Sequence, residues 1–295
     1  MMKMTLGEKI FQVFLILFIS LMCVAMIYPF VHMLVVSLST PMEAVQPGLK
    51  LYPKEISLAA YKSAFQAKEI WYGFGNTIFR TVAGTILSVV LMSMAAYALS
   101  KKYLPHRQFY TMFIVFTMFF SGGLIPMYLL IKGIGLYDTR LVYLLAPPYL
   151  FSTFSLLIMR NFFMSIPAEL EESAKMDGAH DIRILFSLII PLSMPIIATV
   201  SLWSAVAHWN AWFDGMIYVQ DQSKILLQIY LRRLIIENQD AAMATMIRVT
   251  GGQGAVVEET IKAAVLMIAT LPILVIYPFI QKHFAKGIML GSVKG

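Results

Sequence analysis

The chain has 295 residues, of which 59% are hydrophobic and only 13% are Asp, Glu, Lys or Arg. Soluble domains carry about 25% charged residues, so this composition excludes an ordinary soluble domain and indicates a polytopic membrane protein. The net charge of +7 is dispersed between long apolar runs, which favours a role in membrane topology over nucleic-acid binding. A single cysteine, Cys23, excludes an intrachain disulfide and a thiolate metal cluster.

The N-terminal segment resembles a signal peptide, because Lys3 and Lys9 precede an apolar run. That run contains no Asp, Glu, Lys or Arg from Ile10 to Met42, far more than the 7–15 residues of a signal-peptide core. The bulky Met22 before Cys23 argues against lipoprotein cleavage. We therefore expect an uncleaved first membrane span.

Apolar runs of membrane length recur along the whole chain. Crossing about 30 Å of hydrocarbon takes about 20 helical residues, and these runs lack the alternation of a β-barrel. The sequence predicts an all-α polytopic protein with one transmembrane domain over 1–295 and six spans, at 10–38, 72–100, 108–131, 141–163, 184–213 and 263–281. An even number of spans places both termini on one side of the membrane.

The orientation depends on the loops. A raw count of Lys and Arg does not separate the two sides, but the compact cluster KKYLPHR at 101–107 favours the cytoplasm for its loop and both termini. The outer segments are then 39–71 and 214–262. Within the second, KILLQIYLRRLIIENQD has apolar residues at helical spacing and predicts a surface helix, and GGQG at 251–254 predicts a flexible turn.

Motifs for bond chemistry are missing. GGQGAVVEE lacks the lysine and the spacing of a P-loop, the five histidines form no metal-binding pattern, and no G-x-S-x-G occurs. We expect no catalytic residue, no metal site and no cofactor bound by this chain. The spans also lack Asp and Glu, which weakens a proton-coupled mechanism.

The stretch ELEESAKMDGAHDIRILFSLIIP at 169–191 is unusually acidic. Ser165 and Pro167 suit the start of a helix, Gly178 suits its left-handed end, and Asp181 suits the start of the next helix. Pro191 and Pro195 predict a kink or a local loosening. The pattern predicts an elbow over 165–183 made of a short helix, a turn and a helix entering the membrane; a solvated acidic connector is the alternative.

This stretch resembles the signature of ABC-importer permeases, which is E-A-A, three residues, glycine, nine residues and I-x-L-P. Here Glu172, Ser173 and Ala174 are followed by Gly178 and then by LIIP ending at Pro191, with the spacing kept in full. IPAELEESAKMDGA at 166–179 and YPFIQKHFAKGIMLGSVKG at 277–295 are similar to the maltose-permease-like carbohydrate branch. SGGLIPMYLLIKGIGLYDT at 121–139 and WNAWFDGMIYV at 209–219 are similar to its complex-oligosaccharide subgroup.

The resemblance implies the type I importer permease fold, with a cytoplasmic coupling helix at about 167–180 that docks on a separate ATPase. It implies ATPase-coupling roles for Glu169, Glu172, Ser173, Ala174, Asp177, Gly178, Pro191, Lys294 and Gly295. For Glu172 and Gly178, stabilisation of the helix start and close packing are the simpler alternatives.

A sugar path calls for aromatic faces and polar hydrogen-bonding groups. Trp209, Asn210, Trp212 and Asp214 have this character, although an interfacial aromatic belt would explain them too. Asn76 and Arg80 lie four residues apart on one helical face and are costly to expose to lipid. Lining a path and bracing another helix fit these two residues equally well.

The expected function is that of a permease subunit, without enzyme activity of its own, of an ATP-driven importer of oligosaccharides in the bacterial plasma membrane. The resemblance implies a second homologous permease, two ATPase subunits that hold ATP and Mg²⁺, and an extracytoplasmic solute-binding protein as partners. A stand-alone secondary carrier or channel, and a membrane sensory protein, are the alternatives.

Overall fold

The computed structural model describes residues 5–147, 149–236 and 257–289. These residues are helical apart from loops and turns, and within them the sole β pairing is an isolated bridge between Ser39 and Ile56. They divide into two compact units, one within 1–68 and 231–271 and the other within 69–230 and 272–295. The membrane class inferred from composition thus has an all-helical framework.

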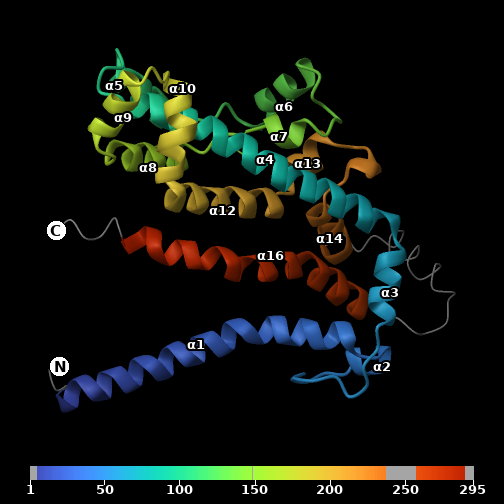
Figure 1. Ribbon diagram of the computed structural model, residues 1–295. Helices are drawn as coiled ribbons and strands as arrows, with labels where there is room; N and C mark the ends of the chain where they lie inside the picture. The colour runs from blue at the N-terminus through green and yellow to red at the C-terminus, as the bar shows by residue number, and fades with distance from the viewer. Residues whose placement is uncertain (1–4, 148, 237–256, 290–295) are drawn as a thin grey trace. The chain divides into compact units, whose positions relative to one another are not determined.

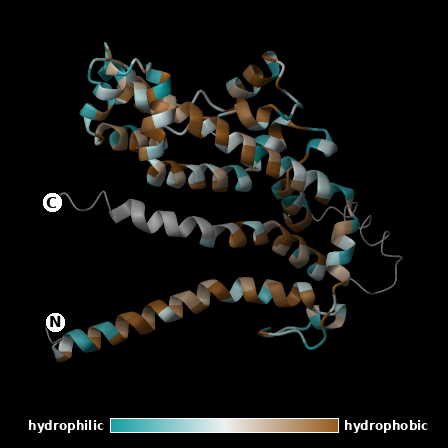
Figure 2. Cartoon of the chain, in the orientation of Figure 1, coloured by the Kyte–Doolittle hydropathy of each residue, from teal (hydrophilic) through white to brown (hydrophobic). Residues whose placement is uncertain are grey.

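The first unit is dominated by α1 (Leu6–Leu38), which is apolar on every side along most of its length (Figure 2). Its start is fixed by a capping box, in which the Thr5 amide donates to Glu8 Oε2 at 2.7 Å and the Glu8 amide donates to Thr5 Oγ1 at 3.4 Å. The long apolar stretch is exposed in the isolated chain, as expected of a helix surrounded by lipid. Short helices α2 (Pro41–Ala44) and α3 (Ala59–Gln66) follow.

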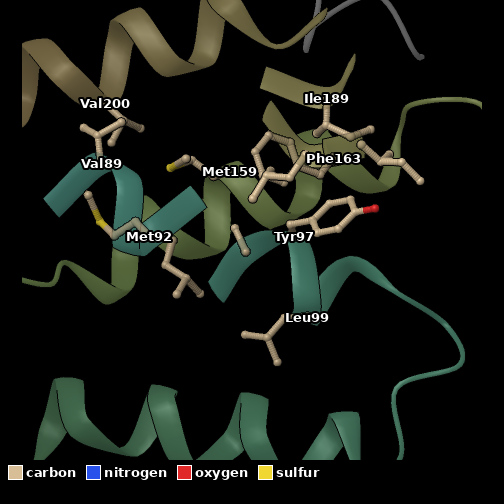
Figure 3. Close-up of a cluster of buried hydrophobic side chains, with 12 residues drawn as sticks. Val89, Met92, Tyr97, Leu99, Met159, Phe163, Ile189 and Val200 are labelled. Carbon is tan, nitrogen blue, oxygen red and sulfur yellow. The ribbon is translucent and has the colours of Figure 1, made fainter. Parts of the chain in front are cut away.

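The second unit is organised around α4 (Lys68–Ser100), a continuous helix of 33 residues without proline. It buries small and polar residues along one side, including Ser88, Ser93 and Ala96, which allows other helices to approach closely. A cluster of buried apolar side chains joins the C-terminal half of α4 to α8 (Thr153–Met164) and to the segment 184–200 (Figure 3). Met92, Met159 and Ile189 are among its members and are each at most 1% exposed (Figure 3).

Two of the expected spans bend sharply along their length. The segment expected at 108–131 consists of α5 (Arg107–Phe119) and α6 (Leu124–Gly133), which meet at 111°. Gly122 and Gly123 lie at this break, and Gly123 has a positive φ of 89° that favours glycine. Together the two helices are long and apolar enough to cross a membrane.

The segment expected at 184–213 also bends. It contains α10 (Asp181–Ile184), a π-helical turn (Leu185–Ile189), α11 (Ile190–Leu192) and α12 (Met194–Asn210). The parts before and after Ser193 meet at 89°. Pro191 and Pro195 lack an amide hydrogen, so the α-helical ladder cannot continue through this region. The kink and the loosening expected from these prolines are both observed.

The segment expected as one span at 141–163 is not a continuous helix. It contains α7 (Val142–Leu145), a non-helical stretch and α8. Pro147 and Pro148 occur between the two helices in the sequence and remove backbone donors, which the apolar count did not register. Length and composition therefore mark α1 and α4 as candidate spans by themselves, with each bent pair as one further candidate.

The segment expected on the outer side at 214–262 includes most of α13 (Phe213–Tyr218), a short 3-10 turn (Gln222–Lys224) and α14 (Leu227–Ile236). The helix expected from the spacing in KILLQIYLRRLIIENQD is therefore present as α14. The expected turn at 251–254 lies outside the described residues. The last helix, α16 (Glu258–Met289), includes the stretch expected as the sixth span at 263–281.

Candidate functional site

A buried ion pair joins α4 to α13. Arg80 Nη1 donates to Asp214 Oδ1 at 2.9 Å, and Arg80 Nη2 lies 2.7 Å from Asp214 Oδ2. The Arg80 side chain is fully buried, and that of Asp214 is 5% exposed. A two-point contact of this kind satisfies both charges in a low-dielectric interior, where either charge alone would be costly.

Aromatic rings and His208 enclose the Arg80 guanidinium. Its central carbon lies 4.5 Å from the centroid of the Tyr149 ring and 5.3 Å from that of Tyr143, and Arg80 Nε donates to His208 Nδ1 at 3.5 Å. The His208 ring packs against Gly84, where an added Cβ would lie 2.5 Å from the nearest ring atom. Glycine at position 84 therefore allows α12 to bring His208 against α4.

One turn earlier, α4 holds the loop before α14. Asn76 Nδ2 donates to the carbonyls of Ser223 and Ile225 at 2.9 and 3.0 Å, and the Leu227 amide donates to Thr77 Oγ1 at 3.0 Å. Tyr143 Oη donates to the Lys224 carbonyl at 2.9 Å. Of the two roles that fit Asn76 and Arg80 from the sequence, their contacts favour bracing.

The other residues expected along a sugar path lie in different surroundings. Trp209 is buried and meets Phe74 edge to face, with ring centroids 5.9 Å apart. Asn210 is exposed and donates to the Val206 carbonyl of its own helix. Trp212 is half-buried beside Phe213. Of the residues expected along a sugar path, the fold thus brings Arg80 and Asp214 into direct contact.

A cavity of about 380 Å³ lies next to the ion pair. Its lining mixes aromatic faces, hydroxyls and apolar groups from α4, α8, α12 and the segment just before α8: Met92, Tyr149, Ser152, Phe154, Ser155, Trp203, Ser204 and Ala207. Phe154 and Trp203 have ring centroids 6.0 Å apart, and Ser204 Oγ lies 2.8 Å from Ser88 Oγ. Tyr149 lines the cavity, and its aromatic ring also stacks against the Arg80 guanidinium.

No pattern in the sequence indicated this cavity. Its residues are spread over more than 100 positions, and each looks ordinary in an apolar run. Only the packing of α8 and α12 on α4 brings these serines and rings together. No three His, Cys, Asp or Glu side chains within the described ranges are grouped so that they could hold a metal ion.

The acidic elbow contains the expected helix, α9 (Ala168–Met176). It ends in a left-handed glycine, because Gly178 has φ of +80°, its amide donates to the Lys175 carbonyl, and the Ala179 amide donates to the Ala174 carbonyl. These two bonds are those of a Schellman cap. The expected start differs: Ser165 closes α8 by donating to the Phe162 carbonyl, and Pro167 occupies the N-cap position of α9.

The next helix also begins one residue earlier than expected, with His180 at its N-cap and Asp181 in its first turn. Asp181 lies 3.2 Å from Lys175 Nζ, which also donates to Tyr103 Oη at 3.3 Å. This bond to the phenol oxygen raises the pKa of Lys175 above its ordinary value. The turn after α9 is therefore held by side chains as well as by backbone bonds.

One face of α9 is anchored and the other is open. Glu171 contacts Lys101 through both carboxylate oxygens, and Ala174 packs on the apolar cluster of Figure 3. Glu169, Glu172, Ser173, Met176 and Asp177 are exposed, and Met176 reaches 88% exposure. Of the expected coupling residues, Pro191 lies in the adjacent kink, whereas Lys294 and Gly295 lie outside the described residues.

Comparison with known proteins identifies the class. Residues 85–290 match the family described as binding-protein-dependent transport system inner membrane component. The chain is 42% identical to the polygalacturonan/rhamnogalacturonan transport system permease protein YtcP of Bacillus subtilis, over all of both chains. It is 41% identical to protein LplC of Bacillus subtilis, over 100% of this chain and 98% of that one.

A solved structure has the same fold. The match is to a chain in the crystal structure of a bacterial ABC transporter involved in the import of the acidic polysaccharide alginate. The two chains superpose with a TM-score of 0.89 at 32% identity, over 96% of this chain and 100% of that one. Fold and relatives together define a membrane-embedded permease component of a transporter. The chain belongs to the family of inner-membrane components of binding-protein-dependent transport systems.

Proposed function

We propose that this chain is one permease subunit of an ATP-driven importer of oligosaccharides, and that fragments of acidic polysaccharides are its substrates. The relatives named for polygalacturonan and alginate transport support the substrate class. The observation that carries the transport role is the anchored helix α9, whose open face carries carboxylates and an exposed methionine. Such a face suits docking of a separate ATPase subunit, which would hold the ATP and Mg²⁺.

We infer six membrane crossings, with the bent pairs α5–α6 and α10–α12 each forming one crossing and α8 completing another. The termini and α9 are cytoplasmic in this arrangement. The contact between Lys101 and Glu171 supports this orientation, because it brings the elbow to the same end of α4 as the basic loop at 101–107 (Figure 1). Basic loops favour the cytoplasmic side of a membrane. A second homologous permease, two ATPase subunits and a solute-binding protein complete the proposed assembly.

The cavity lined by Tyr149, Trp203 and Ser204 is the proposed sugar-contacting site within this chain. Sugar rings present apolar faces that stack on aromatic rings and hydroxyl edges that bond to serine, and ligand sites commonly combine these features. The neighbouring Arg80–Asp214 pair then braces the wall behind Tyr149. Rocking of the helices around such a site would give alternating access.

Reconstitution tests this function. The complete assembly in liposomes, with the solute-binding protein outside and ATP supplied to the ATPase side, should accumulate oligogalacturonate, and omission of the ATPase subunits should abolish uptake. The substitution Glu172→Lys should weaken docking and reduce uptake at unchanged membrane insertion. Uptake by this chain alone, without ATP, would favour a stand-alone carrier instead.

A further inference from the structure

The elbow helix is fastened to the end of α4 by one largely buried lysine. Lys101 follows the last residue of α4, and its ammonium contacts both carboxylate oxygens of Glu171. The same ammonium lies 3.7 Å from the centroid of the Tyr97 ring. The side chains of Lys101 and Glu171 are only 11% and 16% exposed, so water screens this contact weakly.

A second lysine, Lys175, reaches the loop after α4 through Tyr103, its ion pair joins α9 to α10, and it is much more open. Lys175 lies 3.2 Å from Asp181 and 4.9 Å from the centroid of the Tyr103 ring, and its side chain is 42% exposed. Exposed ion pairs contribute about 0–1 kcal/mol, because water and salt screen them. Lys101 is therefore the stronger charged link between α9 and α4.

From this junction α4 runs without interruption to the buried polar contacts. Ser100 and Asn76 are 24 positions apart in one helix, which corresponds to about 36 Å at 1.5 Å per residue. Along this length α4 carries Met92 in the cavity wall, Arg80 bonded to α13, and Asn76 bonded to the loop before α14. A displacement at the end of α4 is thus carried by a stiff element to the cavity.

The alternative route from α9 is less direct. The chain continues from the elbow into α10, but a π-helical turn and an 89° bend at Ser193 separate α10 from α12. Bends of this kind absorb part of a movement, since their backbone hydrogen bonds are already irregular. The continuous α4 is better suited to transmit force from the elbow than the broken helix that follows it in sequence.

We propose that Lys101 is a positioning residue for transport, which passes movements of α9 through Glu171 to α4 and so to the cavity. The proposal rests on the proposed function, in which α9 receives force from an ATPase. It predicts that loss of the Lys101–Glu171 contact separates ATP hydrolysis from transport, instead of lowering both together.

The experiment measures ATP hydrolysis and sugar uptake in the same reconstituted assembly, with oligogalacturonate as the probe. Lys101→Met and Glu171→Gln should each lower the amount of sugar transported per ATP at least fivefold, while hydrolysis stimulated by the binding protein persists. Lys101→Arg should retain the wild-type ratio, because a guanidinium keeps both the ion pair and the ring contact. The double variant K101E/E171K should recover part of the ratio.

The neighbouring exposed residue provides a matched control, and Lys102→Met should leave the ratio unchanged. Equal losses of hydrolysis and uptake in Lys101→Met, without recovery in the double variant, would show a role in assembly only and overturn the proposal. An unchanged ratio in both single variants would overturn it as well. If the unaltered assembly shows no ATP-driven uptake, the proposed function fails first and this inference fails with it.

Discussion

Arg80 and Asp214 form an ion pair that α4 and α13 bury almost completely, with nitrogen–oxygen distances of 2.7 and 2.9 Å. Removing one partner leaves the other charge buried and unpaired, at a cost of about 3–5 kcal/mol. We expect Arg80→Met and Asp214→Asn each to lower the melting temperature of the detergent-purified chain sharply, measured by intrinsic fluorescence. The double variant R80M/D214N should be more stable than R80M alone.

The exposed Arg140 supplies the control for this pair, because Arg140→Met removes the same charge at the surface. Its melting temperature should stay within the error of the wild type. Equal melting temperatures for Arg80→Met and Arg140→Met would contradict the energetic role assigned to the buried pair.

Gly84 lets His208 lie against α4, and a methyl group there would come within 2.5 Å of the His208 ring. That ring has little room to move, because Arg80 and Tyr149 contact it as well. Gly84→Ala should therefore reduce thermal stability and sugar uptake, whereas Gly75→Ala, on the same helix with open space around it, should have little effect. A Gly84→Ala chain as stable as Gly75→Ala would refute the close packing at this position.

The cavity predicts a change in apparent substrate affinity. Trp203→Leu removes an aromatic face from the wall, and such contacts contribute about 0.5–1.5 kcal/mol beyond area burial, equivalent to roughly twofold to twelvefold in KM for uptake. ATP hydrolysis stimulated by the binding protein should persist. Trp71→Leu changes an exposed tryptophan outside the cavity and should leave KM unaltered; equal KM values for both variants would move the sugar site elsewhere.

Gly178 ends α9 in the left-handed region, with open space around the position where a Cβ would be added. The cost of Gly178→Ala is therefore backbone strain of about 1–2 kcal/mol and no steric clash. We expect Gly178→Val to reduce uptake more than Gly178→Asn, because asparagine tolerates this conformation. Gly133→Ala, within α6 and with open space, is the control. Equal uptake by Gly178→Val, Gly178→Asn and Gly133→Ala would exclude backbone strain at position 178 as a determinant of uptake.

Burial lowers the pKa of Lys101 below its ordinary value. The carboxylates of Glu171 and Asp181 raise this pKa in part, and the positive charge of Lys175 lowers it further. The ammonium exists below that pKa and is lost as the pH rises through it. Transport per ATP should therefore decline at alkaline pH sooner than expected for an exposed lysine. Lys101→Arg should remove this decline, because the guanidinium remains charged; identical pH profiles would count against the ion pair.

Local sequence patterns were sufficient to predict several features of the structure. The apolar runs, the helix of the elbow, its left-handed Gly178 and the loosening before Pro191 all follow from residues close together in sequence. The start of α9 was predicted wrongly because Ser165 could either begin α9 or end α8. In the structure it ends α8. The break between α7 and α8 was missed because an apolar count does not register the donors that two prolines remove.

The membrane class, the helical framework and the elbow follow from composition and local pattern, since periodicity, glycine and proline act over a few residues. The pairing of Arg80 with Asp214, the contact of Lys101 with Glu171 and the cavity shared by Trp203 and Tyr149 are seen only in the folded chain. These contacts join residues 70 to 134 positions apart in the two ion pairs. Their formation depends on the packing of helices, which no local pattern specifies.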